Sequence, residues 1–142
     1  MLGVYSRLSI KPGENVLDAG AGIGDFSILT ALANPYSTVV ALEPDPSYFR
    51  ILLQNVKRNN VGNRIPMCVA LSDATGTDTI GFGDTRKTSP RSVRTSTVTE
   101  ILRAQSLDSF EVVKMDIEGM EERVFRDTSR LSQDSRASDR NA

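Results

Sequence analysis

A turn rich in glycine follows an acidic residue near the start of the chain. It consists of Asp18-Ala-Gly20-Ala21-Gly22-Ile-Gly24. Glycines let a backbone turn tightly and approach a ligand without a clash at Cβ. A helix that starts there presents free N–H groups and a partial positive charge, which suits an anionic group. The alternative is a turn between a strand and a helix that binds nothing.

A second acidic residue lies roughly 20 residues beyond the glycines, the spacing typical of nucleoside-binding folds. Glu43 follows an apolar run at residues 38–42, and Pro44 comes next. An acidic residue there accepts hydrogen bonds from both ribose hydroxyls of a nucleoside cofactor. On its own, Glu43 is equally well explained as a solvated carboxylate at a strand end. Its spacing from the glycines favours the nucleoside.

The glycine pattern also bears on which nucleoside binds. The dinucleotide pattern G-x-G-x-x-G requires a glycine at its sixth position, where this chain has Asp25. Asp18, two residues before the first glycine, would repel a pyrophosphate. It suits a ligand with an ammonium group beside its carboxylate, as methionine has, or it orients the turn's own N–H groups. We therefore expect S-adenosylmethionine rather than NAD.

Three segments resemble the FkbM family of class I methyltransferases. They are residues 16–24, 41–44 and, above all, 113–121, where K-M-D-I-E-G-M-E is much more specific than the other two motifs. The resemblance covers roughly residues 11–125. It implies a Rossmann-like sheet, S-adenosylmethionine as methyl donor, and O-methylation of a hydroxyl on a sugar or other small molecule.

The resemblance also assigns each part of the cofactor to a motif. The methionine end falls to the glycine turn, the ribose to the end of the second strand, the adenine to the end of the third, and the methyl group to the end of the fourth. The residues are, in that order, Asp18, Gly20, Ala21, Gly22 and Gly24; Glu43 and Pro44; Ser72 and Asp73; and Asp116 and Glu118.

A hydroxyl acceptor must lose a proton, and the chain has no histidine to accept it. That absence also excludes Ser-His-Asp and Cys-His catalysis and His-ligated metals. Asp116 or Glu118 is then the best base, and Lys114 is less suited because strand alternation points it elsewhere. The alternative is that both carboxylates stabilise a helix dipole. Cys68 cannot form a Cys-x-x-Cys site, so we predict no metal and a buried thiol.

The pattern of apolar residues predicts the elements that position these groups. Strands are expected at residues 15–19, 38–42, 65–71 and 111–117, with helices starting at Asp25 and at a cap formed by Asp45 or Ser47. This alternation is typical of an α/β fold, a mostly parallel Rossmann-like sheet with helices on both faces. Asp18, Glu43, Asp73 and Asp116 should meet at the carboxyl edge of that sheet.

The remaining segments are less regular. Residues 77–82 suggest an extra strand, 83–96 an exposed loop, and 97–104 a short helix or strand. Residues 1–127 are expected to form an incomplete methyltransferase core that lacks its C-terminal strands, and 128–142 a disordered polar tail. The fourth strand should lie beside the first with its other edge open, which invites self-association.

The net charge of −1 gives no reason to expect nucleic acid or an anionic membrane as a partner. No apolar run approaches the roughly 20 residues of a membrane span, and residues 1–12 lack a signal sequence. We therefore expect a cytoplasmic protein with a small-molecule acceptor. The alternatives are an inactive cofactor-binding fragment, a tRNA methyltransferase and a nicotinamide-dependent enzyme.

Overall fold

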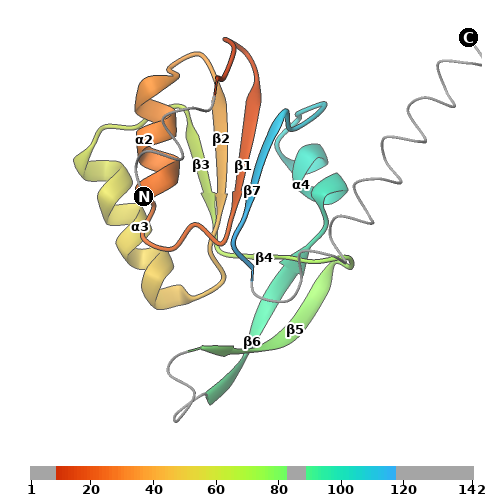
Figure 1. Cartoon of the computed structure of the whole chain (residues 1–142). Helices are drawn as coiled ribbons and strands as arrows, with labels where there is room; N and C mark the ends of the chain where they lie inside the picture. Colours follow the sequence, from red (N-terminus) through yellow and green to blue (C-terminus); the bar gives the residue numbers. More distant parts are fainter. Residues whose placement is uncertain (1–8, 83–88, 118–142) are drawn as a thin grey trace, which may run out of the picture.

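The computed structural model describes residues 9–82 and 89–117, which Figure 1 draws in colour. The elements, in chain order, are β1 (Asn15–Ala19), α2 (Asp25–Ala33), β2 (Thr38–Leu42), α3 (Pro46–Arg58), β3 (Arg64–Met67), β4 (Ala70–Leu71), β5 (Gly76–Phe82), β6 (Ser89–Ser96), α4 (Val98–Ala104) and β7 (Val112–Met115).

Four of these strands form a parallel sheet in the order β3-β2-β1-β7. Leu17 of β1 is in register with Val40 of β2 on one side and with Val113 of β7 on the other. The parallel sheet and the place of the fourth predicted strand beside the first are therefore confirmed. Within the described residues, β7 is an edge strand of this sheet.

Helices cover both faces of the sheet, as Figure 1 shows. On one face, Val16 and Val39 pack against Phe26 and Ile28 of α2. On the other, alternate residues of β1 and β2 pack against Ile101 of α4 and other apolar side chains. This strict alternation matters for the site, because Asp18, two residues after Val16, points to the α2 face.

The two helices beside the site begin differently. Asp45 caps α3, because its carboxylate accepts a hydrogen bond of 2.8 Å from the backbone N–H of Ser47. Pro46 at the first turn suits this start. Gly24 is the N-cap of α2 and has no side chain with which to accept such a bond. The first-turn N–H groups of α2 are thus left without a side-chain cap.

The predicted strand at 65–71 is two strands, so that prediction was wrong. β3 joins the parallel sheet, whereas β4 joins a second sheet of order β4-β6-β5. Cys68 lies in the break between them and is exposed, which contradicts the expected buried thiol. The break turns the chain from one sheet to the other, so residues on its two sides no longer share one face.

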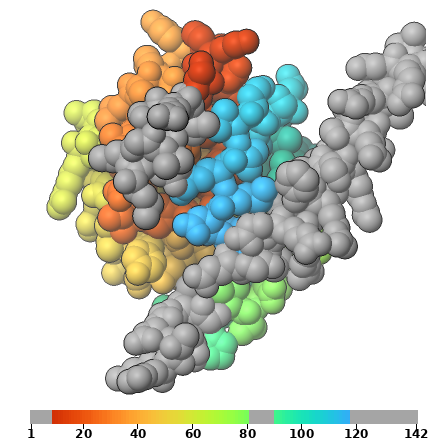
Figure 2. All heavy atoms as spheres, viewed as in Figure 1, coloured from red at the N-terminus to blue at the C-terminus, as the bar shows by residue number. Residues whose placement is uncertain are grey.

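The prediction of an exposed loop at residues 83–96 was also wrong for residues 89–96. Residues 89–96 form β6, which pairs with β5 in an antiparallel hairpin. Val93 and Thr95 are buried while Arg94 between them is exposed, a strand alternation hidden by mostly polar residues. The hairpin extends beyond the edge at which the parallel strands end (Figure 1), and its green atoms lie near the bottom of Figure 2.

The segment at 97–104 is a helix, α4, and Thr97 caps it by accepting a hydrogen bond from the N–H of Glu100 at 3.2 Å. Glu118, the helix expected after it and the polar tail lie outside the described residues. No helix in the described part of the chain is long and apolar enough to cross a membrane.

Candidate functional site

The glycine turn joins β1 to α2 at the carboxyl edge of the parallel sheet. The N–H groups of Gly20 and Ala21 both donate to the carbonyl oxygen of Leu42, at 2.9 and 2.8 Å. The N–H of Gly24 donates to the carbonyl of Ala21 at 3.0 Å. These bonds attach the turn to the end of β2, next to Glu43.

Two of the glycines are required by close packing as well as by backbone conformation. Gly20 has a φ of 79°, and a Cβ there would collide with the carbonyl oxygen of Asp116. Gly24 has a φ of 97°, and a Cβ there would collide with the side chain of Leu52. The turn is therefore held between the end of β7 on one side and α3 on the other.

Glu43 is directed at the turn. Its Oε1 accepts a hydrogen bond of 3.0 Å from the N–H of Gly22, and its Oε2 accepts one of 2.8 Å from the N–H of Asp45. Only 7% of Glu43 is exposed, and burial raises the pKa of its carboxyl, while the two N–H groups oppose that rise. Each oxygen still has a second lone pair with which to accept a ligand hydroxyl.

Asp18 lies beneath the turn and has no exposed surface. Its Oδ2 accepts a hydrogen bond of 2.5 Å from the hydroxyl of Ser27, in the first turn of α2, and its Oδ1 lies 3.4 Å from Nζ of Lys114. Burial raises the pKa of Asp18, and Ser27, Lys114 and Arg64 oppose the rise. In this geometry Asp18 holds the start of α2.

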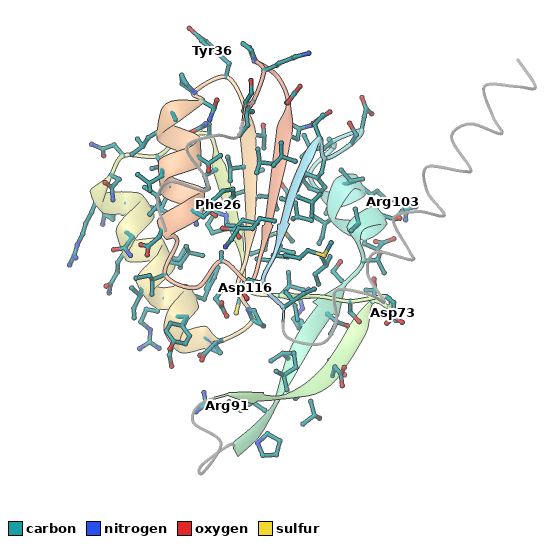
Figure 3. The ribbon with its side chains drawn as sticks, in the orientation of Figure 1. Phe26, Tyr36, Asp73, Arg91, Arg103 and Asp116 are labelled. Carbon is teal, nitrogen blue, oxygen red and sulfur yellow. The ribbon has the colours of Figure 1, made fainter. Side chains whose placement is uncertain are left out.

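Asp116 comes directly after β7, and its side chain is exposed. Its N–H donates to the carbonyl oxygen of Ala19 at 2.9 Å, and its own carbonyl lies against Gly20. Figure 3 shows Asp116 at the edge where the parallel strands end. The structure therefore brings the predicted fourth-strand residue to the glycine turn.

Ser72 and Asp73 are placed differently from the expectation. They follow β4, so Asp73 does not lie at the end of a strand of the parallel sheet. Ser72 is buried, its N–H donates to the carbonyl of Ser96 at 2.9 Å, and its hydroxyl donates to Asp73 Oδ1 at 3.2 Å. Asp73 and Asp116 lie well apart in Figure 3. Contact of Ser72 and Asp73 with an adenine stays a prediction.

Two cations lie at the site that were not among the predicted site residues. Lys114 pairs with Asp18 and lies over the ring of Phe26, with Nζ 5.1 Å from the ring centroid. Arg64, the first residue of β3, has a buried side chain near Asp18. Its only signal in the sequence is its place at the start of an apolar run. In residues 9–82 and 89–117, no three carboxylate or thiol side chains gather closely enough to hold a metal ion.

The known proteins that are similar to this chain include a methyltransferase and an aminocarboxypropyltransferase. The 31-O-demethyl-FK506 methyltransferase FkbM of Streptomyces tacrolimicus is 39% identical over 75 residues, which are 53% of this chain and 28% of that protein. A tRNA(Phe) (4-demethylwyosine(37)-C(7)) aminocarboxypropyltransferase of Pyrococcus horikoshii is 40% identical over 55 residues, 39% of this chain and 19% of that protein.

Among solved structures, precorrin-6y C5,15-methyltransferase from Geobacter metallireducens is 26% identical, with a TM-score of 0.44, over 46% of this chain and 35% of that one. The chain spans less than a third of the length of the curated relatives described above. The family model of the methyltransferase FkbM domain matches residues 18–138, most of the chain. The chain therefore belongs to the FkbM family of methyltransferases.

Proposed function

We propose that this chain binds S-adenosylmethionine at the carboxyl edge of its parallel sheet and uses it to methylate a hydroxyl of a small molecule. The observation that carries the proposal is the hydrogen bond of 3.0 Å between Gly22 N–H and Glu43. It joins the glycine turn after β1 to the carboxylate after β2, the two groups that a nucleoside linked to an amino acid would need side by side.

The residues present fit this cofactor. Among the residues that the structure describes, none lies within 4 Å of the point where a Cβ of Gly22 would be, so none of them fills the outer side of the turn. The first-turn N–H groups of α2 have no side-chain cap and suit the carboxylate of a methionine. Glu43 offers its remaining lone pairs to the ribose hydroxyls.

When bound, S-adenosylmethionine supplies a methyl group on a positively charged sulfur, which is already a strong electrophile. The protein must then hold the acceptor oxygen in line and remove its proton. Asp116 is exposed at the end of β7 beside Gly20, so it is our candidate for the base. Glu118, the other candidate, follows two residues later. The name of the Streptomyces relative describes a substrate that lacks an O-methyl group, which supports a hydroxyl acceptor.

Isothermal titration with S-adenosylmethionine, S-adenosylhomocysteine and NAD tests the cofactor. We expect binding of the first two and none of NAD, and tighter binding of NAD would overturn the proposal. Transfer of a labelled methyl group to a panel of hydroxylated small molecules, with bulk tRNA as a separate arm, tests the acceptor. The tRNA arm is needed because the Pyrococcus relative is named for a tRNA. Binding without transfer to any acceptor would indicate an inactive cofactor-binding fragment.

A further inference from the structure

Asn55 of α3 holds the backbone of the glycine turn through its side chain. Its Nδ2 donates a hydrogen bond of 2.9 Å to the carbonyl oxygen of Ile23, 32 positions earlier in the chain. α3 lies on the same face of the sheet as α2, the helix that follows the turn (Figure 1). Asn55 is half-buried, so solvent has partial access to the bond and its net contribution should be modest. The bond connects α3 directly to the peptide between Ile23 and Gly24.

α3 meets the turn at a second point, which differs in kind. Leu52, about one turn before Asn55, is fully buried and occupies the space that a Cβ of Gly24 would need. Such an apolar contact fixes how closely the turn approaches α3, but it does not depend on the direction of a peptide group. The hydrogen bond from Asn55 does, because its NH₂ group needs the carbonyl oxygen of Ile23 to face α3.

The peptide between Ile23 and Gly24 has two accessible orientations. In a trans peptide the C=O and N–H groups point in opposite directions. The Ile23 oxygen therefore faces Asn55 while the Gly24 N–H donates to the carbonyl oxygen of Ala21 at 3.0 Å. Gly24 has a φ of 97°, and rotation of the peptide by half a turn would make that φ negative. Glycine adopts both about equally readily, so neighbouring groups must favour one orientation.

Rotation of this peptide would open the glycine turn. Its carbonyl oxygen would then face the carbonyl oxygen of Ala21, and both would lack a donor. The two oxygens would move apart, and the residue next to Ala21 is Gly22, whose N–H donates to Glu43 Oε1 at 3.0 Å. The contact between the turn and Glu43 therefore depends on the orientation that the bond from Asn55 stabilises.

We propose that Asn55 is a positioning residue of the cofactor site, which holds the peptide between Ile23 and Gly24 in one orientation and so keeps the turn closed against Glu43. Its consequence for cofactor binding rests on the function proposed above. Its effect on the turn does not, because that effect can be measured in the protein without cofactor. Two measurements therefore separate the two claims.

The first measurement is the exchange of the Gly24 amide hydrogen with solvent, followed by NMR without cofactor. Asn55→Ala removes the donor, so this amide should exchange about 3- to 10-fold faster, the range for loss of one hydrogen bond. Asn59→Ala is the matched control, because Asn59 Nδ2 donates a bond of 2.8 Å to the carbonyl of Asn55 within α3, not to the turn. In this control, exchange at Gly24 should stay within about twofold of the unaltered protein. Equal acceleration in both variants would show a general weakening of α3 and overturn the proposal.

The second measurement is the affinity for S-adenosylmethionine, by calorimetry. In Asn55→Asp, the carboxylate cannot donate to Ile23 but can accept from the Gly24 N–H once the peptide has rotated, so it favours the rotated orientation. Affinity falls with the fraction of molecules that keep the turn closed, and we expect a loss of about threefold or more. Asn55→Gln keeps an NH₂ group and should recover most of that affinity.

Asn59→Asp controls for the added charge, which it places about one turn later on the same helix, and its affinity should stay within about twofold of the unaltered protein. Equal losses of affinity in Asn55→Asp and Asn59→Asp, or no loss in either, would overturn the proposal. If Asn55→Asp does not fold, the affinity of Asn55→Ala replaces it, with Asn59→Ala as the control. Failure of the unaltered protein to bind the cofactor would contradict the proposed function only, because exchange at Gly24 still decides whether Asn55 holds the turn.

Discussion

Glu43→Gln tests whether Glu43 binds a ligand or only holds the glycine turn. The substitution keeps the shape of the side chain and one carbonyl oxygen. The other oxygen becomes an NH₂ group, which would face the N–H of either Gly22 or Asp45 and could not accept from it. The change therefore removes one charge-assisted hydrogen bond and the negative charge together.

The effect on stability should be small because two contributions oppose each other. A hydrogen bond to a charged group contributes about 1.5–3 kcal/mol. Against this, burial and the nearby carboxylates of Asp45 and Asp18 raise the pKa of Glu43, so its ionised form is disfavoured in the folded state. We expect the free energy of unfolding at neutral pH to change by less than about 1 kcal/mol.

The effect on cofactor affinity should be large, since nothing offsets it. Glu43 is the acceptor proposed for the ribose hydroxyls, and a neutral amide is a weaker acceptor than a carboxylate. A loss of about 1.5–3 kcal/mol corresponds to a decrease in affinity of roughly 10- to 150-fold. Isothermal titration with S-adenosylhomocysteine measures the affinity, and urea denaturation measures the free energy of unfolding.

Asp45→Asn is the matched control. It removes a charge close to Glu43, but asparagine caps a helix as well as aspartate does, so α3 should still start at Pro46. We expect its affinity to stay within about threefold of the unaltered protein, a change too small for loss of a charged hydrogen bond. Equal losses of affinity in the two variants would show that the negative charge near the site matters, rather than the hydrogen bonds that Glu43 accepts. An unchanged affinity in Glu43→Gln would refute ribose binding by Glu43.

Three other predictions concern neighbouring features. Gly20→Ala should lower the free energy of unfolding, measured in urea, by about 1–3 kcal/mol more than Gly13→Ala does. Both positions have a positive φ, but only at Gly20 would a Cβ collide with Asp116. Equal losses in the two variants would show that the contact with Asp116 is unimportant. Asp116→Asn should reduce methyl transfer more than cofactor affinity, and the opposite pattern would make Asp116 a cofactor ligand instead of the base. Within the described residues β7 has an unpaired edge, which should support self-association, so light scattering should find a mass above that of a monomer. Val113→Lys, at a residue 39% exposed, should reduce that mass, and a monomer in both proteins would contradict this prediction.

The sequence predicted the parts of the fold that have simple periodicity. β1 and β2 are short apolar runs, and α2 and α3 have apolar residues at helical spacing, so their existence and parallel arrangement could be predicted. Glu43 could be placed beside the glycine turn because carboxyl ends of parallel strands share one edge. The hydrogen bond between Glu43 and Gly22 could not be predicted, because it depends on the side-chain conformation of Glu43 at the end of β2.

The rest depended on contacts that no local pattern reveals. β6 was missed because its buried positions alternate with Arg and Ser, so composition concealed the strand. Cys68 was expected to be buried because the break between β3 and β4 lies within a continuous apolar run. Arg64 had no signal beyond its place at the start of an apolar run, and the pairing of β3 with β2 brings its guanidinium close to Gly24.

The contact between Gly20 and Asp116 has a consequence for the order of folding. The two sides of the glycine turn come from distant parts of the chain, since Lys114 and Asp18, which are also in contact, are 96 residues apart. At roughly 5–20 residues per second, a ribosome makes that intervening segment in about 5–20 s. For that interval the helices α2 and α3 can pack on β1 and β2 while the turn still lacks the strand that confines it. We therefore expect nascent chains to acquire affinity for the cofactor only after β7 has emerged from the ribosome.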